Sequence, residues 1–275
     1  MWVLVAFVGV AMVGSFTALF YSRNGVERHD APPWVLPVLA GSHVGIMGSL
    51  AGFAVTGIVL IVGLAHGQPA SASTPLSTVV IMMLGAYFFY VGNAFLFTYL
   101  LPSREASKNV PPRVHFALGS TMEYRTLFVS WLALMPLLDA YGLVLPRQVL
   151  AWLVPASMLF GSVIITMLTA NVGLMRIKEI IATIALSVVL SLGYGALVLF
   201  VVPGLRSEFS SIAVTLVIFC LNGTAFMVAA ITPLSPRYPA VEAFFEKYGR
   251  RIVIIDLQLT VISLAFLGLA VAGAI

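Results

Sequence analysis

Eight apolar runs, each close to the length needed to cross a membrane, constrain this chain more than any other feature of its sequence. They cover residues 2–22, 38–65, 77–101, 116–142, 149–174, 180–203, 211–232 and 252–274. A helix needs about 20 mostly apolar residues to cross the hydrocarbon core of a bilayer. The pattern therefore predicts an all-α, polytopic membrane protein with eight transmembrane helices.

The composition agrees with this prediction and excludes several other classes. Apolar residues make up 61% of the chain and charged residues 9%, against about 45–50% and about 25% in soluble domains. The single cysteine, Cys220, lies in an apolar run, so neither a disulfide framework nor a cysteine metal site is expected. No HExxH, GxSxG or Walker motif occurs. We therefore expect no catalytic residues, no metal site and no enzymatic activity of the chain by itself.

The distribution of basic residues predicts the orientation in the membrane. Only Arg147 and Arg206 fall in the second, fourth and sixth connections, whereas the first, third, fifth and seventh connections hold most of the others: Arg23, Arg28, Arg104, Lys108, Arg113, Arg176, Lys178, Arg237, Lys247, Arg250 and Arg251. Loops rich in Lys and Arg stay in the cytoplasm. The sequence predicts a multi-pass protein of the cell membrane with both termini outside. The excess of basic residues is explained by this topology and does not indicate binding of nucleic acid.

The two halves of the chain look like one four-helix unit written twice, over residues 1–142 and 143–275. The fourth and eighth spans place polar residues at matching intervals, with Glu123, Arg125 and Ser130 in one and Asp256, Gln258 and Ser263 in the other. Shorter matches in the same order link the other three pairs of spans. Because each unit has an even number of spans, the two halves are expected to insert the same way up.

Charged residues inside the fourth span are the strongest indication of a functional interior. A charge in the bilayer core costs at least about 2.5–3.5 kcal/mol on insertion scales, so it needs a partner or a wet cavity. Glu123 and Arg125 are two residues apart, about 200° around a helix, so each needs a partner on another helix. Asp256 is expected at the same depth, in the cytoplasmic half. We expect Arg125 to lie between the two acids, with Gln258 as its uncharged counterpart.

Other polar residues in the spans are candidates for the same interior: His43, Asn93, Asn222 and Tyr90. Each has a structural alternative, because Asn in a membrane helix often only joins helices, and His43 could bond to a neighbouring carbonyl. Small residues are dense in the second span, and spacings such as Gly41-x3-Gly45 and Gly48-x3-Gly52 allow close helix packing. The set is Gly41, Gly45, Gly48, Ser49, Gly52 and Gly57. The segment PAVEAFFEKYGRRI, which mixes aromatic with basic residues, is expected to lie along the inner membrane surface.

Three functions fit these patterns. The first is a transporter or channel for a small solute or ion, in which Glu123 and Asp256 bind protons or cations beside Arg125. The second is a membrane anchor subunit of a redox complex that binds a quinone near His43, Asn93, Tyr90 and Glu123 and has a soluble redox partner. The third is a structural or assembly protein whose polar core only holds helices together. Only the second function requires a cofactor, a quinone. The expected partners are the lipid bilayer and the solute or ion, and a second copy of the chain is a further candidate.

Overall fold

The computed structural model describes residues 35–65, 70–101, 109–133, 161–200 and 211–272. This part of the chain is all-helical and contains no strand. Its elements are the helices α2 (Val35–Ala65), α3 (Ala70–Thr98), α4 (Val110–Leu132), α7 (Ile177–Phe200), α8 (Ser211–Ile231) and α9 (Pro239–Ala272), the short 3₁₀ helix η3 (Thr232–Leu234) and a helical stretch over Gly161–Asn171.

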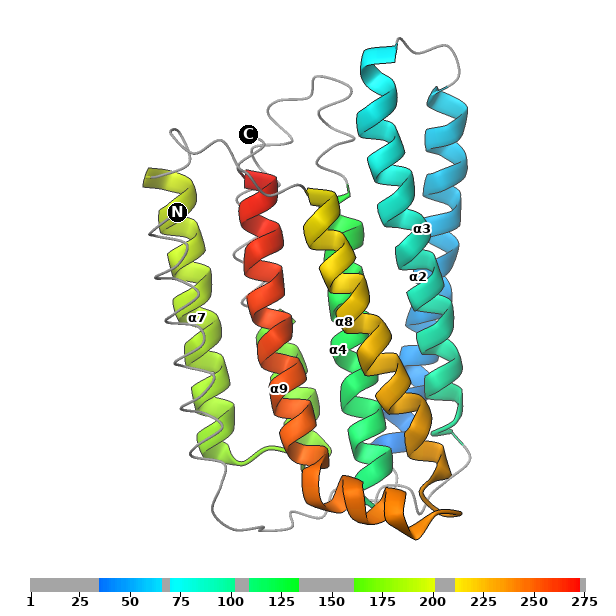
Figure 1. Ribbon diagram of the computed structural model, residues 1–275, viewed down its shortest axis with the longest axis vertical. Coiled ribbons are helices and arrows are strands. Elements are labelled where there is room, and N and C mark those ends of the chain that lie inside the picture. The colour runs from blue at the N-terminus through cyan, green and yellow to red at the C-terminus, as the bar shows by residue number, and fades with distance from the viewer. Residues whose placement is uncertain (1–34, 66–69, 102–108, 134–160, 201–210, 273–275) are drawn as a thin grey trace.

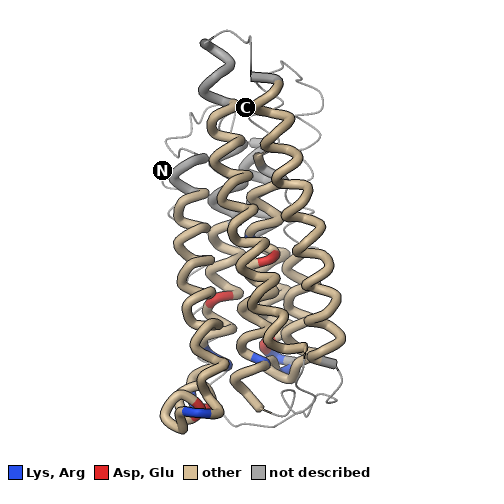
Figure 2. The backbone as a smooth tube through the Cα atoms, turned by 90° about the vertical axis from the view of Figure 1, so that its right-hand side faces the viewer, with Lys and Arg blue, Asp and Glu red and all other residues tan. Residues whose placement is uncertain are grey.

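The described helices stand side by side and alternate in direction (Figure 1). Most of the Lys and Arg positions gather towards one end of the bundle, beside the first part of α9 (Figure 2). The described basic residues of the third, fifth and seventh connections, among them Arg113, Arg176 and Arg237, come from that end. The alternation of charge along the sequence thus corresponds to a separation of charge between the two ends of the bundle.

The described helices fall where the apolar runs predict helices, but three of them start six or more residues earlier. α3 begins at Ala70, seven residues earlier than expected. The expected span over residues 2–22 lies outside the described residues. α4 begins six residues earlier than expected, and α9 begins at Pro239, thirteen residues earlier. Within the described residues, three helices are long and apolar enough to cross a membrane, over Leu36–Gly63, Leu76–Thr98 and Thr215–Leu234. A membrane location follows from these helices.

The early start of α9 forms an elbow (residues 239–250) that runs across the basic end before the helix turns up into the bundle (Figure 1). One face of the elbow is buried: a Cβ on Gly249 would meet Val114 of α4 at 2.6 Å. Arg250 forms an ion pair with Glu179, which also accepts a hydrogen bond from the backbone N–H of Arg176 at the start of α7 (2.9 Å). The opposite face exposes Phe244 and Lys247. This is the amphipathic segment that the sequence predicts, and it is tied to both α4 and α7.

α4 lies at the centre of the described bundle. It packs against α2, α3, α8 and α9, and Leu127 is its only exposed residue between positions 110 and 130. By contrast, α2 and α3 expose large apolar side chains, including Phe53 and Phe95, each 72% exposed. Exposed apolar surface on outer helices suits lipid, whereas a helix enclosed by protein can hold polar groups if they find partners. The polar sequence of α4 is therefore explained by its central position.

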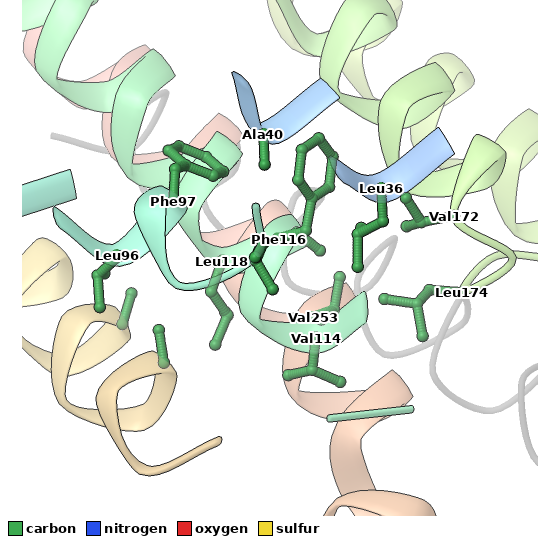
Figure 3. Packing of buried hydrophobic residues seen from close by; sticks show 14 of the residues in the cluster. Leu36, Ala40, Leu96, Phe97, Val114, Phe116, Leu118, Val172, Leu174 and Val253 are labelled. Carbon is green, nitrogen blue, oxygen red and sulfur yellow. The ribbon is translucent and has the colours of Figure 1, made fainter. Parts of the chain in front are cut away.

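The largest apolar cluster joins α4 to its neighbours near the basic end. In Figure 3 the rings of Phe97 and Phe116 lie beside Ala40, while Val114 and Val253 pack lower in the same cluster. The ring centroids of Phe97 and Phe116 are 5.6 Å apart in an edge-to-face arrangement, a favoured geometry for aromatic pairs. This cluster fixes the mutual positions of α2, α3, α4 and α9 below the polar interior.

Small residues bring α3 and α8 close together. A Cβ on Gly85 would meet the ring of Phe219 at 2.2 Å, and a Cβ on Gly92 would meet Phe226 at 3.2 Å. Gly85 and Gly92 are seven residues apart on α3, and Phe219 and Phe226 are seven residues apart on α8. The two contacts therefore lie two turns apart on one face of each helix.

The expectation that the α2 glycines serve helix packing is confirmed for Gly57, where a Cβ would meet Met83 of α3 at 3.1 Å, and for Gly41, where it would meet Leu101 at 3.6 Å. Gly45, Gly48 and Gly52 meet no described residue within 4 Å.

The packing of the described helices does not mirror the sequence duplication. In the first half α3 packs against both α2 and α4, whereas in the second half α9 packs against both α7 and α8. α7 and α8 would be the equivalents of α2 and α3, yet α9 lies between them (Figure 1). The two halves of the described chain therefore arrange their equivalent helices differently.

We expect Gly85→Ala to lower the free energy of unfolding by about 1–3 kcal/mol, because the added methyl group displaces Phe219 from the α3–α8 interface. Gly52→Ala is the matched control on the exposed face of α2, where no atom of the described residues lies within 4 Å of the added methyl group. It should leave stability unchanged or raise it by up to about 1 kcal/mol. Thermal unfolding in detergent measures both, and equal effects would contradict the close contact at Gly85.

Candidate functional site

α4 separates two polar clusters because its charged residues point to opposite sides. Glu123 faces α2 and forms an ion pair with His43. Arg125 faces α8 and α9 and forms an ion pair with Asp256, with 2.8 Å between Nη1 and Oδ1. Among the described residues, Glu123 and Arg125 form no ion pair with each other. The prediction that each needs a partner on a different helix is confirmed, and so is the pairing of Arg125 with Asp256.

Arg125 is the most completely enclosed charge in the described chain. Its side chain is 0% exposed. Nε donates to Asn222 Oδ1 of α8 at 2.7 Å, and Nη1 donates to Thr260 Oγ1 of α9 at 3.1 Å as well as to Asp256. Nη2 has no hydrogen-bond partner within the described residues. The guanidinium therefore joins three helices, and its positive charge is neutralised by one carboxylate.

The carboxylate of Asp256 is held from both sides. Thr121 Oγ1 of α4 donates to Oδ2, while Arg125 donates to Oδ1. Asn222 Nδ2 in turn donates to Thr126 Oγ1 of α4 at 3.0 Å. Breaking a buried ion pair by removing one partner costs about 3–5 kcal/mol, because the other charge is left uncompensated. Asp256 thus belongs to a fixed structural network, which we name the clamp: Thr121, Arg125, Thr126, Asn222, Asp256 and Thr260.

The second cluster, which we name the junction, lies where α2, α3 and α4 meet. His43 Nδ1 contacts Glu123 Oε2. The His43 ring stacks on Phe97, with centroids 4.8 Å apart, and meets the edge of Phe116 at 5.3 Å. The His43 and Glu123 side chains remain 10% and 13% exposed. Both partners can gain or lose a proton, and they carry no permanent charge comparable to the guanidinium of the clamp.

Two further predicted residues belong to the junction. Tyr90 of α3 is 1% exposed, and its hydroxyl lies 3.0 Å from Ser130 Oγ of α4. Asn93, one turn further along α3, donates from Nδ2 to the Gly119 carbonyl at 2.8 Å. Its Oδ1 is buried and has no hydrogen-bond partner among the described residues. The expectation that Arg125 lies between both acids is wrong, because Glu123 has its own partner in His43.

Gln258 lies apart from both clusters as far as its described contacts show. It is buried on α9, and its Nε2 has no partner within the described chain. Thr121 and Thr260 were not predicted, although each is four residues from a charged member of the clamp and so shares its helix face. His115 is also buried, and bonds to the Leu96 and Ala229 carbonyls and to Thr232 Oγ1 rather than to Glu123.

No group of three or more His, Cys, Asp or Glu residues that could hold a metal ion occurs in the part of the chain that is described. The sequence matches no protein-family model, and the comparisons with curated proteins and with solved structures found no match. The two clusters are therefore interpreted from their own geometry.

We expect Arg125→Met to lower the free energy of unfolding by roughly 3–5 kcal/mol, since it leaves the partly buried Asp256 carboxylate without its cation. Lys247→Met is the matched control, because it also removes one cation but from the exposed face of the elbow, where Nζ lies 5.0 Å from the Tyr248 ring centre. That change should cost no more than about 1 kcal/mol. Unfolding midpoints in detergent compare them, and a similar loss in both variants would contradict the clamp.

Proposed function

We propose that the chain is an integral membrane transporter or channel for a small solute or ion, and that Glu123 with His43 forms its ion-exchanging site. The observation that carries the proposal is the pairing of two titratable side chains in the junction. Ionisable residues inside a membrane bundle mark ion or substrate pathways by default. Asp256 is assigned a structural role instead, because Arg125 and Thr121 already occupy both of its oxygens.

The difference between the two basic partners supports this assignment. The Arg125 side chain is completely enclosed and the His43 side chain is 10% exposed, while the two carboxylates are alike, with Asp256 12% and Glu123 13% exposed. In the clamp, the permanent positive charge of Arg125 already neutralises the Asp256 carboxylate. A mobile cation is therefore not needed there to balance the charge. Glu123 instead faces the imidazole of His43, which carries no permanent charge. A mobile cation can therefore balance the negative charge of the Glu123 carboxylate.

We infer eight spans with both termini outside as the membrane arrangement. Support comes from the alternating directions of the described helices and from the basic residues gathered at one end (Figures 1 and 2). The described end of α9 lies opposite the basic end, as this arrangement requires. The duplication of residues 1–142 in residues 143–275 is retained as a proposal that rests on the sequence correspondences alone.

The test is ion flux into liposomes that contain the purified protein. Glu123→Gln removes the exchangeable charge and keeps the size of the side chain, so flux should fall by about tenfold or more. Glu242→Gln makes the same chemical change on the exposed elbow and should leave flux unchanged. A folded Glu123→Gln protein with normal flux would remove Glu123 from the mechanism and favour a purely structural role for the junction.

A quinone-binding membrane anchor is the second candidate, and the aromatic walls of the junction favour it. Phe97 and Phe116 flank His43, while Tyr90 and Glu123 lie close by, a combination of apolar surface and hydrogen-bonding groups that suits a quinone head group. Titration with a short-chain quinone distinguishes the two functions. The transport proposal predicts no saturable binding, whereas binding that His43→Leu abolishes would favour the anchor.

A further inference from the structure

We propose that the ion exchanged at Glu123 is a proton, and that it moves between Glu123 and the far end of the bundle through the hydroxyl groups of Tyr90 and Ser130. This inference rests on the proposed function and deepens it by naming the ion and the next two groups on its path. It is carried by the arrangement of hydrogen-bond donors and acceptors in the junction.

The contacts limit the positions of the hydrogens in this pair. Ser130 Oγ donates its only hydrogen to the Thr126 carbonyl at 3.0 Å. Either hydroxyl could donate in the 3.0 Å contact between Tyr90 and Ser130; when Ser130 donates to the Thr126 carbonyl, it accepts from the Tyr90 hydroxyl. Ser130 shares the α4 face of Glu123, so its partner Tyr90 lies on the side of α4 that carries Glu123, and the lone pairs of the Tyr90 oxygen remain able to accept a proton.

The path runs along one face of α4. Glu123 and Ser130 are seven residues apart, which places them on the same face and about 10 Å apart along the axis. Because α4 starts at the basic end, Ser130 lies farther from that end than Glu123 does (Figure 1). Asn93, one turn from Tyr90 on α3, turns a buried Oδ1 without a described donor towards Gly119 in the same junction. A buried amide oxygen of this kind is suited to hold a bridging water.

A proton fits this site better than a metal cation does. Hard cations such as Ca²⁺ and Mg²⁺ take about six or more oxygen ligands, and Glu123 is the only carboxylate of the described junction. Its partner is an imidazole nitrogen, a group that can either donate or accept a hydrogen bond. Beyond Glu123 the path offers single hydroxyl groups, each of which can accept one proton while it releases another.

The transfer step conserves charge and involves no oxidation. The proton leaves the Glu123 carboxylic acid, through one water, for the Tyr90 oxygen as the phenolic proton passes to Ser130 Oγ. The Ser130 hydrogen then leaves the Thr126 carbonyl for a water beyond it. One proton enters and one leaves, and rotation of the two hydroxyl groups restores the starting arrangement. Tyr90 and Ser130 return to their original protonation states, whereas Glu123 is left as a carboxylate and returns to its starting state when it takes up the next proton from the side of the basic end.

The experiment measures proton entry into liposomes with an internal pH-sensitive dye, in H₂O and in D₂O. Tyr90→Phe and Ser130→Ala each interrupt the path and should slow proton flux by about tenfold or more, while circular dichroism and unfolding midpoints stay near those of the unmodified protein. Tyr99→Phe is the matched control, because it also removes a tyrosine hydroxyl bonded across helices, in this case to the Pro233 carbonyl at 3.4 Å. Its flux should be unchanged.

The outcomes separate this inference from the proposed function. Normal proton flux in Tyr90→Phe, together with loss of flux in Glu123→Gln, would overturn the path and leave the proposed site standing. Flux of Na⁺ or K⁺ in place of protons would overturn the identity of the ion. Unchanged flux in Glu123→Gln would overturn the proposed function itself. Loss of the solvent isotope effect on flux in Ser130→Ala, beside a normal isotope effect in Tyr99→Phe, would support the path independently of protein stability.

Discussion

The neutralisation of two opposite charges on one central helix is the constraint on which the described structure depends. Glu123 and Arg125 are too far around α4 to reach each other, and an uncompensated charge inside a membrane bundle is costly. Each charge is therefore paired with a residue on a different helix, His43 of α2 or Asp256 of α9. These pairings hold α4 between its neighbours, while the apolar surfaces of α2, α3 and α8 face outward.

The two pairs differ in chemistry, and this difference suggests a structural role for the clamp and an ion-exchanging role for the junction. The clamp connects α4, α8 and α9 through a guanidinium that donates hydrogen bonds to both neighbouring helices, so it suits a fixed scaffold. The junction contains an imidazole, a carboxylate, a phenol and a hydroxyl, all of which can exchange protons. Rigid support next to a titratable group is the arrangement that a selective ion path needs, because the path then changes protonation without moving the helices.

The sequence predicts more of the fold than of the site. Hydropathy locates the described helices to within several residues, and three of them are long and apolar enough to cross a membrane. The two-residue spacing of Glu123 and Arg125 correctly predicts that they face apart. Asp256 could be identified as the partner of Arg125 because few other charges lie in the spans. His43 could not be assigned to Glu123, since the sequence does not show that α2 approaches that face of α4. The same uncertainty about neighbours explains why the close contacts of Gly85 and Gly92 of α3 with α8 were not predicted from the sequence.

The most direct test of the account is a pair of double-mutant cycles on unfolding free energy in detergent, using Arg125→Met with Asp256→Asn and Arg125→Met with Glu123→Gln. The account predicts a coupling energy of about 1 kcal/mol or more between Arg125 and Asp256, and a value near zero between Arg125 and Glu123. Equal coupling of Arg125 to both acids would contradict it, because the two charges of α4 would then share one network instead of facing separate partners.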